Sequence, residues 1–280
     1  MQFGLHLHPD RGVDAVLAEA RFADDQSFDS VWTGDHLLGI RGDPSPDAPL
    51  ETWTLMTAIG ALTSHVRIAF AMLNPSFRNP AILAKMIATL DQITHGRVIC
   101  SLGAGWFEDE YTQYDVPFIA NHDVRIAHER EVVLLLRELW THPAPERTTF
   151  SGSHVQVSSL AFNPRPYQQP HPPIWIGGNS PATQSLVKEL ADGWVLLSKG
   201  DVKPVIAEAC SARDWPTRPP ITIVAGITLT ADDTIATARE RIDDLAACGI
   251  TYLRMNFATL EQQAEFAQQI LTLEPAGPSR

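Results

Sequence analysis

The sequence contains few cysteines and no long apolar segment. Cys100, Cys210 and Cys248 are odd in number, lie far apart and show no metal-ligand spacing, so they predict reduced thiols rather than a disulfide framework or a metal centre. No run approaches the roughly 18 apolar residues of a membrane-spanning helix. The first ten residues, MQFGLHLHPD, lack the basic and apolar regions of a secretory leader, and a cytoplasmic location is therefore expected.

Positive charge is also scarce. The chain has 21 Lys and Arg residues against 33 Asp and Glu residues, a formal net charge of −12, and no basic block long enough to follow a phosphate backbone. Nucleic acids and anionic membrane surfaces are therefore not expected as partners. An acidic balance is also common among soluble cytosolic enzymes and says little about the substrate.

Eight short apolar runs predict strands at 2–8, 28–34, 66–73, 96–103, 173–178, 193–198, 221–229 and 251–257. Amphipathic patterns between them predict helices at 13–26, 52–64, 79–94, 124–140, 181–191, 201–212, 231–248 and 259–273. Pro80 and Pro181 each follow a polar residue and suit the first turn of a helix. Strand and helix alternate throughout, which is typical of a parallel sheet.

Eight βα units in 280 residues predict an α/β fold, a closed (β/α)₈ TIM barrel that forms one domain over residues 1–280. Two connections are longer than usual. Residues 35–51 follow the second strand, and 141–171 precede the fifth strand and include an expected hairpin around Ser151 and Gly152. Long loops in a compact domain are commonly lids or insertions, and the second segment is expected to be one.

The active site of such a barrel lies at the carboxyl ends of its strands. Gly177, Gly178, Asn179 and Ser180 end the fifth strand and enter a helix, an arrangement that suits a phosphate or another anion beside a helix N-terminus. A tight turn in which Ser180 caps the helix explains the same residues. The Gly-Ala-Gly of residues 103–105 allows either close approach of the backbone to a flat ligand or a simple turn.

Histidines at strand ends suggest two different chemistries. His36, which follows Asp35 after the second strand, is a candidate proton donor or acceptor, and a loop histidine bonded to the backbone is the alternative. His6 and His8 share one face of the first strand, as the metal ligands of amidohydrolase-like enzymes do. The ends of the fourth, fifth, sixth and eighth strands offer no His or carboxylate, so this metal-dependent hydrolase is the weaker hypothesis.

Three segments together resemble the bacterial luciferase-like family of flavin- and deazaflavin-dependent oxidoreductases. They are FDSVWTGDH (28–36), FRNPAILAKMIATLDQITHGRVICSLGAGWFEDEY (77–111) and PPIWIGGNSPATQSLVKELADGW (172–194). The middle segment is the most specific, because its helix start, Leu-Asp-Gln, Gly-Arg and Gly-Ala-Gly-Trp follow the family's order. The resemblance covers most of the chain.

The resemblance implies a site. It implies a non-prolyl cis peptide at Ala71-Met72 behind the cofactor ring, His36 with Asp35 as the catalytic pair, and His8 and Trp106 as walls of the substrate pocket. The residues expected to contact the cofactor are Ala71, Met72, Asn74, Gly103, Ala104, Gly105, Gly177, Gly178, Asn179 and Ser180. Well-known relatives pair the histidine with a carboxylate just after the glycine-rich turn, where this chain has Trp106. Oxidation of a sugar phosphate is therefore not expected, and the sequence assigns no role to Glu108 or Glu110.

The resemblance further implies a cofactor, either the deazaflavin coenzyme F420 or FMN. The short chain favours F420, which implies hydride transfer to or from a small organic substrate with His36 moving the proton. The alternative is an FMN-dependent monooxygenase served by a separate reductase, and a non-catalytic flavin-binding protein is a third reading. F420 carries an acidic tail, for which Arg41, Arg78, Lys199 and Lys203 are the candidate partners. A homodimer through the helix at 52–64 is also expected.

Overall fold

The computed structural model describes residues 1–39, 49–142, 145–197, 205 and 220–271. Eight parallel strands form one sheet in the order β3-β2-β1-β10-β9-β8-β7-β4. They are β1 (Gln2–His6), β2 (Ser30–Thr33), β3 (Arg67–Phe70), β4 (Cys100–Leu102), β7 (Ile174–Gly177), β8 (Gly193–Val195), β9 (Thr222–Thr228) and β10 (Tyr252–Asn256). Parallel bridges from Ile68 to Val98 and from Leu73 to Leu102 join β3 to β4. The sheet therefore closes on itself, and the predicted barrel is confirmed.

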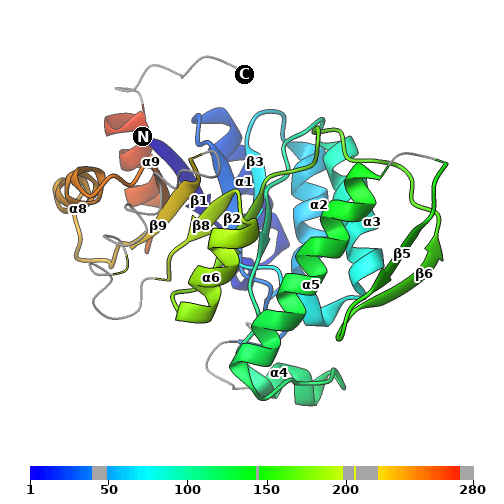
Figure 1. The fold of residues 1–280 in the computed structure, drawn as a ribbon. Coiled ribbons are helices and arrows are strands. Elements are labelled where there is room, and N and C mark those ends of the chain that lie inside the picture. The colour runs from blue at the N-terminus through cyan, green and yellow to red at the C-terminus, as the bar shows by residue number, and fades with distance from the viewer. Residues whose placement is uncertain (40–48, 143–144, 198–204, 206–219, 272–280) are drawn as a thin grey trace.

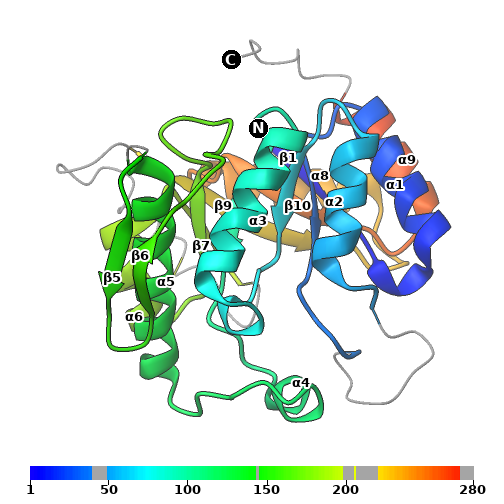
Figure 2. The same cartoon turned by 90° about the vertical axis from the view of Figure 1, so that its right-hand side faces the viewer.

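Helices surround the strands (Figures 1 and 2). The α-helices are α1 (Val13–Asp25), α2 (Thr52–Leu62), α3 (Pro80–Ile93), α4 (Glu108–Gln113), α5 (His122–Thr141), α6 (Pro181–Leu190), α8 (Ile235–Ala247) and α9 (Leu260–Gln269). Two short 3₁₀ helices, η1 (Pro9–Arg11) and η2 (Pro75–Phe77), follow β1 and β3. Asn79 and Ser180 cap α3 and α6, each ahead of a proline, as the sequence predicts.

The described elements agree with the prediction except at three short helices. The eight strands lie inside the predicted runs, and the expected hairpin is present as β5 (Thr148–Ser151) and β6 (Gln156–Leu160), an antiparallel pair that lies outside the barrel beside α5 (Figure 2). The prediction missed η1, η2 and α4, because elements of three to six residues carry too little periodicity to be seen. The helix predicted at 201–212 lies outside the described residues, apart from Val205.

Two layers of apolar side chains build the core. The larger layer lies between the strands and the helices. The smaller one fills the barrel interior and contains Trp32, Trp175 and Tyr252, whose rings lie 5.3 to 6.2 Å from one another. These bulky rings block the barrel axis. Any site must therefore lie above them, at the carboxyl ends of the strands, where α4 is found at the bottom of Figure 1.

Among the described helices, none combines the length and the apolar composition that crossing a bilayer requires.

Candidate active site

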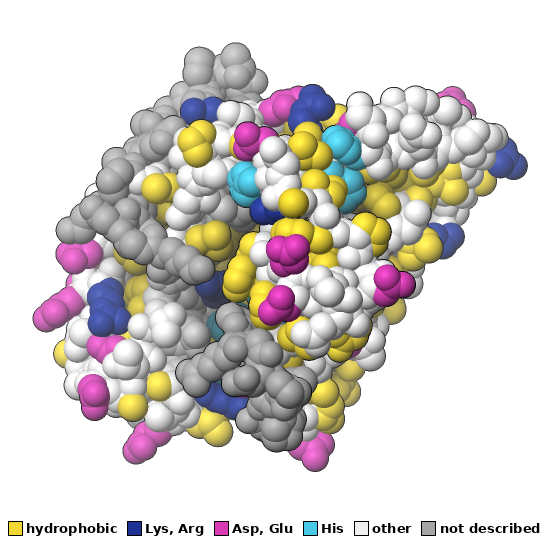
Figure 3. Space-filling view, turned by 90° about the horizontal axis from the view of Figure 1, so that it is seen from below, with side chains coloured by type: hydrophobic (Ala, Val, Ile, Leu, Met, Phe, Trp, Pro, Cys, Tyr) yellow, Lys and Arg dark blue, Asp and Glu magenta, His cyan; other side chains and the backbone are white. Residues whose placement is uncertain are grey.

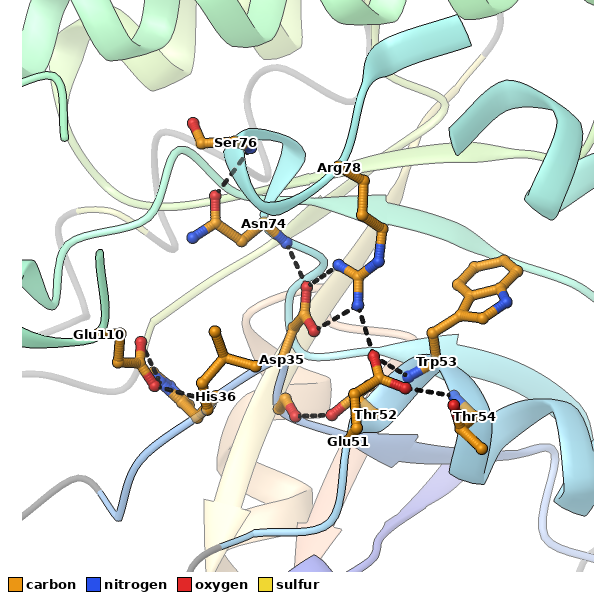
Figure 4. A network of polar contacts seen from close by, with 12 residues as sticks. Asp35, His36, Glu51, Thr52, Trp53, Thr54, Asn74, Ser76, Arg78 and Glu110 are labelled. Atoms are coloured by element: carbon orange, nitrogen blue, oxygen red, sulfur yellow. Dashed lines mark hydrogen bonds and ion pairs between the residues drawn. The ribbon is translucent and has the colours of Figure 1, made fainter. Parts of the chain in front are cut away.

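Asp35 follows β2 and is held by a dense set of contacts (Figure 4). Its side chain is 1% exposed and accepts hydrogen bonds from both terminal nitrogens of Arg78, at 2.6 and 2.9 Å, and from the backbone N–H of Asn74 at 2.9 Å. Arg78 also contacts Glu51 at 2.9 Å, and Glu51 caps α2 by accepting from the N–H groups of Trp53 and Thr54. The Asp35 carboxylate is thus occupied by the protein, and its geometry suits positioning the β2 loop rather than reacting with a substrate.

His36 turns the other way from Asp35 and meets Glu110 (Figure 4). Its Nδ1 lies 3.1 and 3.2 Å from the two carboxylate oxygens of Glu110. The same carboxylate accepts the backbone N–H groups of Leu37 at 2.7 Å and Leu38 at 3.1 Å. Because a carboxylate only accepts, Nδ1 carries the proton in this contact and Nε2 is left to exchange a proton elsewhere.

Glu110 contacts His36 in this site, although the sequence analysis assigned it no role. It is the third residue of α4 and is 2% exposed, although the helix begins with Glu108 and Asp109 at its surface. The buried side chains Glu110 and Tyr111 lie between exposed neighbours. A buried carboxylate that accepts three hydrogen bonds can hold a loop and a ring together. The signal in the sequence was the hydrophobic Tyr111 directly after a run of acids.

Trp106 and Asn74 lie at the same rim but differ in exposure. The Trp106 ring is 54% exposed, lies 6.0 Å from the His36 ring at 74° and stacks on Phe107. Asn74 is buried, donates from its side-chain amide to the Tyr111 hydroxyl at 2.6 Å and accepts from the backbone of Ser76. Trp106 is therefore placed to meet a ligand, whereas the Asn74 side chain is used within the protein.

The cis peptide at Ala71-Met72 is present at the end of β3. The Met72 side chain reaches across the ends of two neighbouring strands. A Cβ atom on Gly103 would lie 2.9 Å from Met72 Cβ, and one on Gly177 would lie 2.6 Å from Met72 Cγ. These two glycines therefore make room for Met72, which forms a shelf at this point of the mouth.

The turn after β7 combines internal bonds with unused donors. Ser180 caps α6 by accepting from Thr183 N at 3.1 Å, and the Asn179 side chain bonds both the N–H and the C=O of Leu197, at 3.0 and 2.7 Å. Gly178 has φ 135°, which favours glycine. Among the described residues, no hydrogen-bond partner is recorded for the backbone N–H groups of Asn179 and Ser180. Both interpretations of this turn, capping and anion binding, are compatible with this geometry.

His6 and His8 lie on the opposite side of the mouth, on and just after β1. Their rings are 5.7 Å apart at 85°. Burial, together with the nearby Arg254, holds the pKa of His6 well below its usual value, and burial also lowers the pKa of His8. In the described part of the chain, no three His, Cys, Asp or Glu side chains gather closely enough to hold a metal ion.

Four basic residues were expected to be candidate partners of the acidic tail of F420. The guanidinium of Arg78 is paired with Asp35 and Glu51 within the protein, and its contact with a cofactor tail stays a prediction. Arg41, Lys199 and Lys203, together with part of the loop at 35–51, lie outside the described residues.

The chain is similar in sequence and in structure to known proteins. The family model described as luciferase-like monooxygenase matches residues 1–277. An F420-dependent glucose-6-phosphate dehydrogenase of Microbacterium testaceum is 30% identical over 204 residues, which are 72% of this chain and 58% of that protein. An FMNH₂-dependent dimethylsulfone monooxygenase of Pseudomonas putida is 30% identical over 163 residues, 58% of this chain and 43% of that protein.

Among solved structures, an F420-dependent secondary alcohol dehydrogenase in complex with an F420-acetone adduct has a TM-score of 0.80 at 20% identity. The match covers 98% of this chain and 99% of that one, and at this identity it shows the shared fold. The chain spans about half the length of the two curated relatives described above.

Proposed function

Because this chain belongs to the luciferase-like monooxygenase family, we propose that it is a coenzyme F420-dependent oxidoreductase. It transfers hydride between the deazaflavin and a small organic substrate, and His36 donates or accepts the proton. The observation that carries this proposal is the His36 ring held by the buried Glu110 beside the exposed Trp106. Among the relatives, a dehydrogenase that depends on F420 supports the choice of cofactor.

The residues at the mouth fit a flavin-type cofactor. The N–H groups of Asn179 and Ser180 suit an anion site next to the positive end of the ten-residue helix α6. The cofactor phosphate would bind there. The Met72 shelf, enclosed by Gly103 and Gly177, would support the ring system. When bound, F420 supplies a hydride-carrying ring carbon, whereas FMN supplies a ring that, once reduced, reacts with O₂.

His36 and its neighbours would control the proton. Glu110 fixes the imidazole through Nδ1, so Nε2 is the atom that exchanges a proton with substrate. Asp35 acts indirectly, because its bonds to Arg78 and Asn74 fix the backbone from which His36 projects. Trp106 would cover the substrate and limit the access of water. Glu110 and Asp35 are thus positioning residues in this proposal.

A pair of variants in one helix tests the role of Glu110. Glu110→Gln keeps the size of the side chain but removes the carboxylate, and we expect turnover to fall while the dissociation constant of the cofactor stays within twofold. Glu108→Gln, on the exposed side of α4, is the matched control and should leave both quantities unchanged. Equal turnover in the two variants would remove Glu110 from the mechanism.

The FMN-dependent monooxygenase is the second candidate, and the relative from Pseudomonas putida favours it. It would require a separate reductase to supply reduced FMN. Equilibrium binding of oxidised F420 and of FMN to the cofactor-free protein separates the two candidates. Tight binding of F420 alone supports hydride transfer, while preference for FMN together with consumption of O₂ would overturn our proposal in favour of the monooxygenase. Binding of neither cofactor would contradict both.

We also propose a homodimer that forms through α2 and α3. A groove of about 210 Å³ between these helices is lined by apolar side chains that include Trp53, Ile82, Met86 and Ile93. Ile82 is 60% exposed and Ile93 is 44% exposed, and an apolar patch of this kind is typical of an interface. Ile82→Glu should convert a dimer to a monomer in light scattering, whereas a wild-type monomer at high protein concentration would refute the dimer.

A further inference from the structure

Two histidines, on β1 and just after it, have buried ring nitrogens with unmet bonding capacity, and the partly exposed Arg254 on β10 lies near them. His6 Nδ1 and His8 Nε2 are both buried and have no hydrogen-bond partner among the described residues. They lie on one face of β1 and its extension, because side chains two residues apart share a face of a strand. His6 is in register with the inward-facing Trp32, which places this face inside the barrel.

Arg254 completes the group. It lies two residues after the inward-facing Tyr252 on β10, hence on the same inner face and one step nearer the mouth. Its register neighbours, Gly4 on β1 and Gly226 on β9, have no side chains to accept from it. Within the described ranges no ion pair joins Arg254 to a carboxylate.

The electrostatics of this group favour an anion. Burial lowers the pKa of the Arg254 guanidinium, which nevertheless stays charged, and the charge of Arg254 in turn lowers the pKa of His6. A guanidinium offers five N–H donors and no acceptor, and a buried charge without a partner is destabilising. Each neutral imidazole offers one donor and one acceptor and adds no negative charge. The missing component is therefore an anionic acceptor.

The surface at this end of the barrel is hollowed. Figure 3 looks onto the face that carries α4 and shows a depression near its centre, in which Arg or Lys and His atoms are visible. The surrounding rim contains acidic side chains, in keeping with the net charge of −12.

We propose that Arg254, together with His6 and His8, binds an oxyanion group of the substrate, so that the substrate is a small organic acid. Its carboxylate, or a sulfonate or phosphate in the same place, would occupy the β1-β10 side, and its reacting carbon would extend toward His36 at the end of β2. This inference rests on the proposed function for the reaction, but the anion site itself requires no cofactor. Arg is the side chain best suited to bidentate contact with such a group.

The test is a titration of the cofactor-free protein with acetate, methanesulfonate and inorganic phosphate, followed by tryptophan fluorescence, because Trp32 lies in the barrel interior. We expect at least one probe to saturate with a single site, and the preferred probe identifies the type of acid. Arg254→Met should weaken that binding at least tenfold. Arg147→Met, at an exposed arginine directly before β5, is the matched control and should stay within twofold of the wild type. Failure of all three probes to saturate the wild type, or equal binding by Arg254→Met, would overturn the proposal.

Thermal unfolding separates a binding role from a structural one. If Arg254 serves a ligand, Arg254→Met removes an unpaired buried charge, and its Tm without ligand should equal or exceed that of the wild type. Arg254→Lys keeps the charge and should retain measurable binding. A Tm well below the wild type for Arg254→Met, combined with loss of binding in Arg254→Lys, would make Arg254 a structural residue.

The outcomes also separate this site from the proposed reaction. Anion binding that depends on Arg254, in a protein that binds neither F420 nor FMN, would refute the redox proposal and leave the anion site standing. F420 binding without any anion binding would refute the anion site alone.

Discussion

The two sides of the barrel mouth differ in how completely their polar groups are paired. On the β2-β3 side, Asp35 bonds Arg78 and Asn74, and Glu110 bonds His36 and two backbone N–H groups. On the β1-β10 side, which adjoins it, His6 Nδ1 and His8 Nε2 have no hydrogen-bond partner in the described part of the chain, and burial lowers the pKa of the nearby Arg254.

The difference indicates that the two sides of the mouth have different roles. Charge-assisted hydrogen bonds in a buried setting fix side chains in one geometry, which is the requirement for a residue that must transfer a proton. Buried polar groups without a partner destabilise the folded protein, and a ligand that bonds to them removes this cost. The paired side therefore suits preorganised chemistry, and the unpaired side suits recognition.

The largest effect is expected from breaking the paired side at Arg78. Arg78→Gln leaves the Asp35 carboxylate, which is 1% exposed, without its ionic partner, and loss of one member of a buried pair costs about 3–5 kcal/mol. Urea denaturation should show this as a lower free energy of unfolding. Arg147→Gln, at an exposed position directly before β5, should change stability by less than about 0.5 kcal/mol. A loss as small as the control's would mean that the Asp35 pair is not stabilising.

The next effect is expected on catalysis at His36. His36→Asn removes the group that exchanges the proton and should lower turnover by about 10²-fold or more, with little change in cofactor affinity. Steady-state kinetics with the cofactor selected by the binding test, together with its dissociation constant, gives both quantities. Unchanged turnover would remove His36 from the catalytic role.

A smaller effect is expected on the unpaired side, in the pH dependence of the stability that His6 contributes. In the folded protein the pKa of His6 is well below its usual value of 6.5. Below pH 6.5 the His6 side chain therefore takes up a proton in the unfolded chain but stays neutral in the folded protein. Stability from this group is present above pH 6.5 and is lost as the pH falls below that value, by roughly 1 kcal/mol between pH 7.5 and 5.5. His6→Asn should flatten this dependence in urea denaturation.

His65→Asn is the matched control for His6, since its side chain is 80% exposed and its substitution should leave the pH dependence nearly as in the wild type. If both variants behave like the wild type, His6 is not held neutral by its surroundings.

The smallest effect is expected at the turn after β7. It tests whether the Ser180 hydroxyl is used within the protein, as the paired groups on the β2-β3 side are. Ser180→Ala removes the cap of α6 and should cost about 1 kcal/mol of stability. Ser185→Ala, in the same helix but bonded only to the carbonyl of Pro181, should cost less. If Ser180→Ala keeps full stability but loses cofactor affinity, the hydroxyl serves the ligand and not the helix.

Most of the fold could be predicted because its signals are local. Apolar runs at 66–73 and 173–178 and proline at the start of α3 and α6 depend on neighbouring residues only, and the structure has strands and helices there. The luciferase-like family and the barrel are confirmed. Both cofactors weighed from the sequence occur among the relatives.

The candidate site was less predictable because it is assembled across long sequence separations. The sequence placed His36 and Asp35 at a strand end, yet it could not show that the two side chains diverge, Asp35 to Arg78 and His36 to Glu110. Nor could it tell Glu110 from Glu108, since both are acids in a six-residue helix. Which carboxylate is buried depends on the packing of α4 against the β2 loop.

The sequence by itself determined the alternation of strands and helices, the barrel, the family and the strand ends at which chemistry is expected, because periodicity and turn residues act over a few positions. Only the tertiary structure decided which polar groups are satisfied. Hydrogen bonds such as that from His36 to Glu110, 74 residues apart, and the inward placement of His6 beside Arg254 arise when the barrel closes. A buried polar group is paired or left unpaired by neighbours that only the closed barrel brings together.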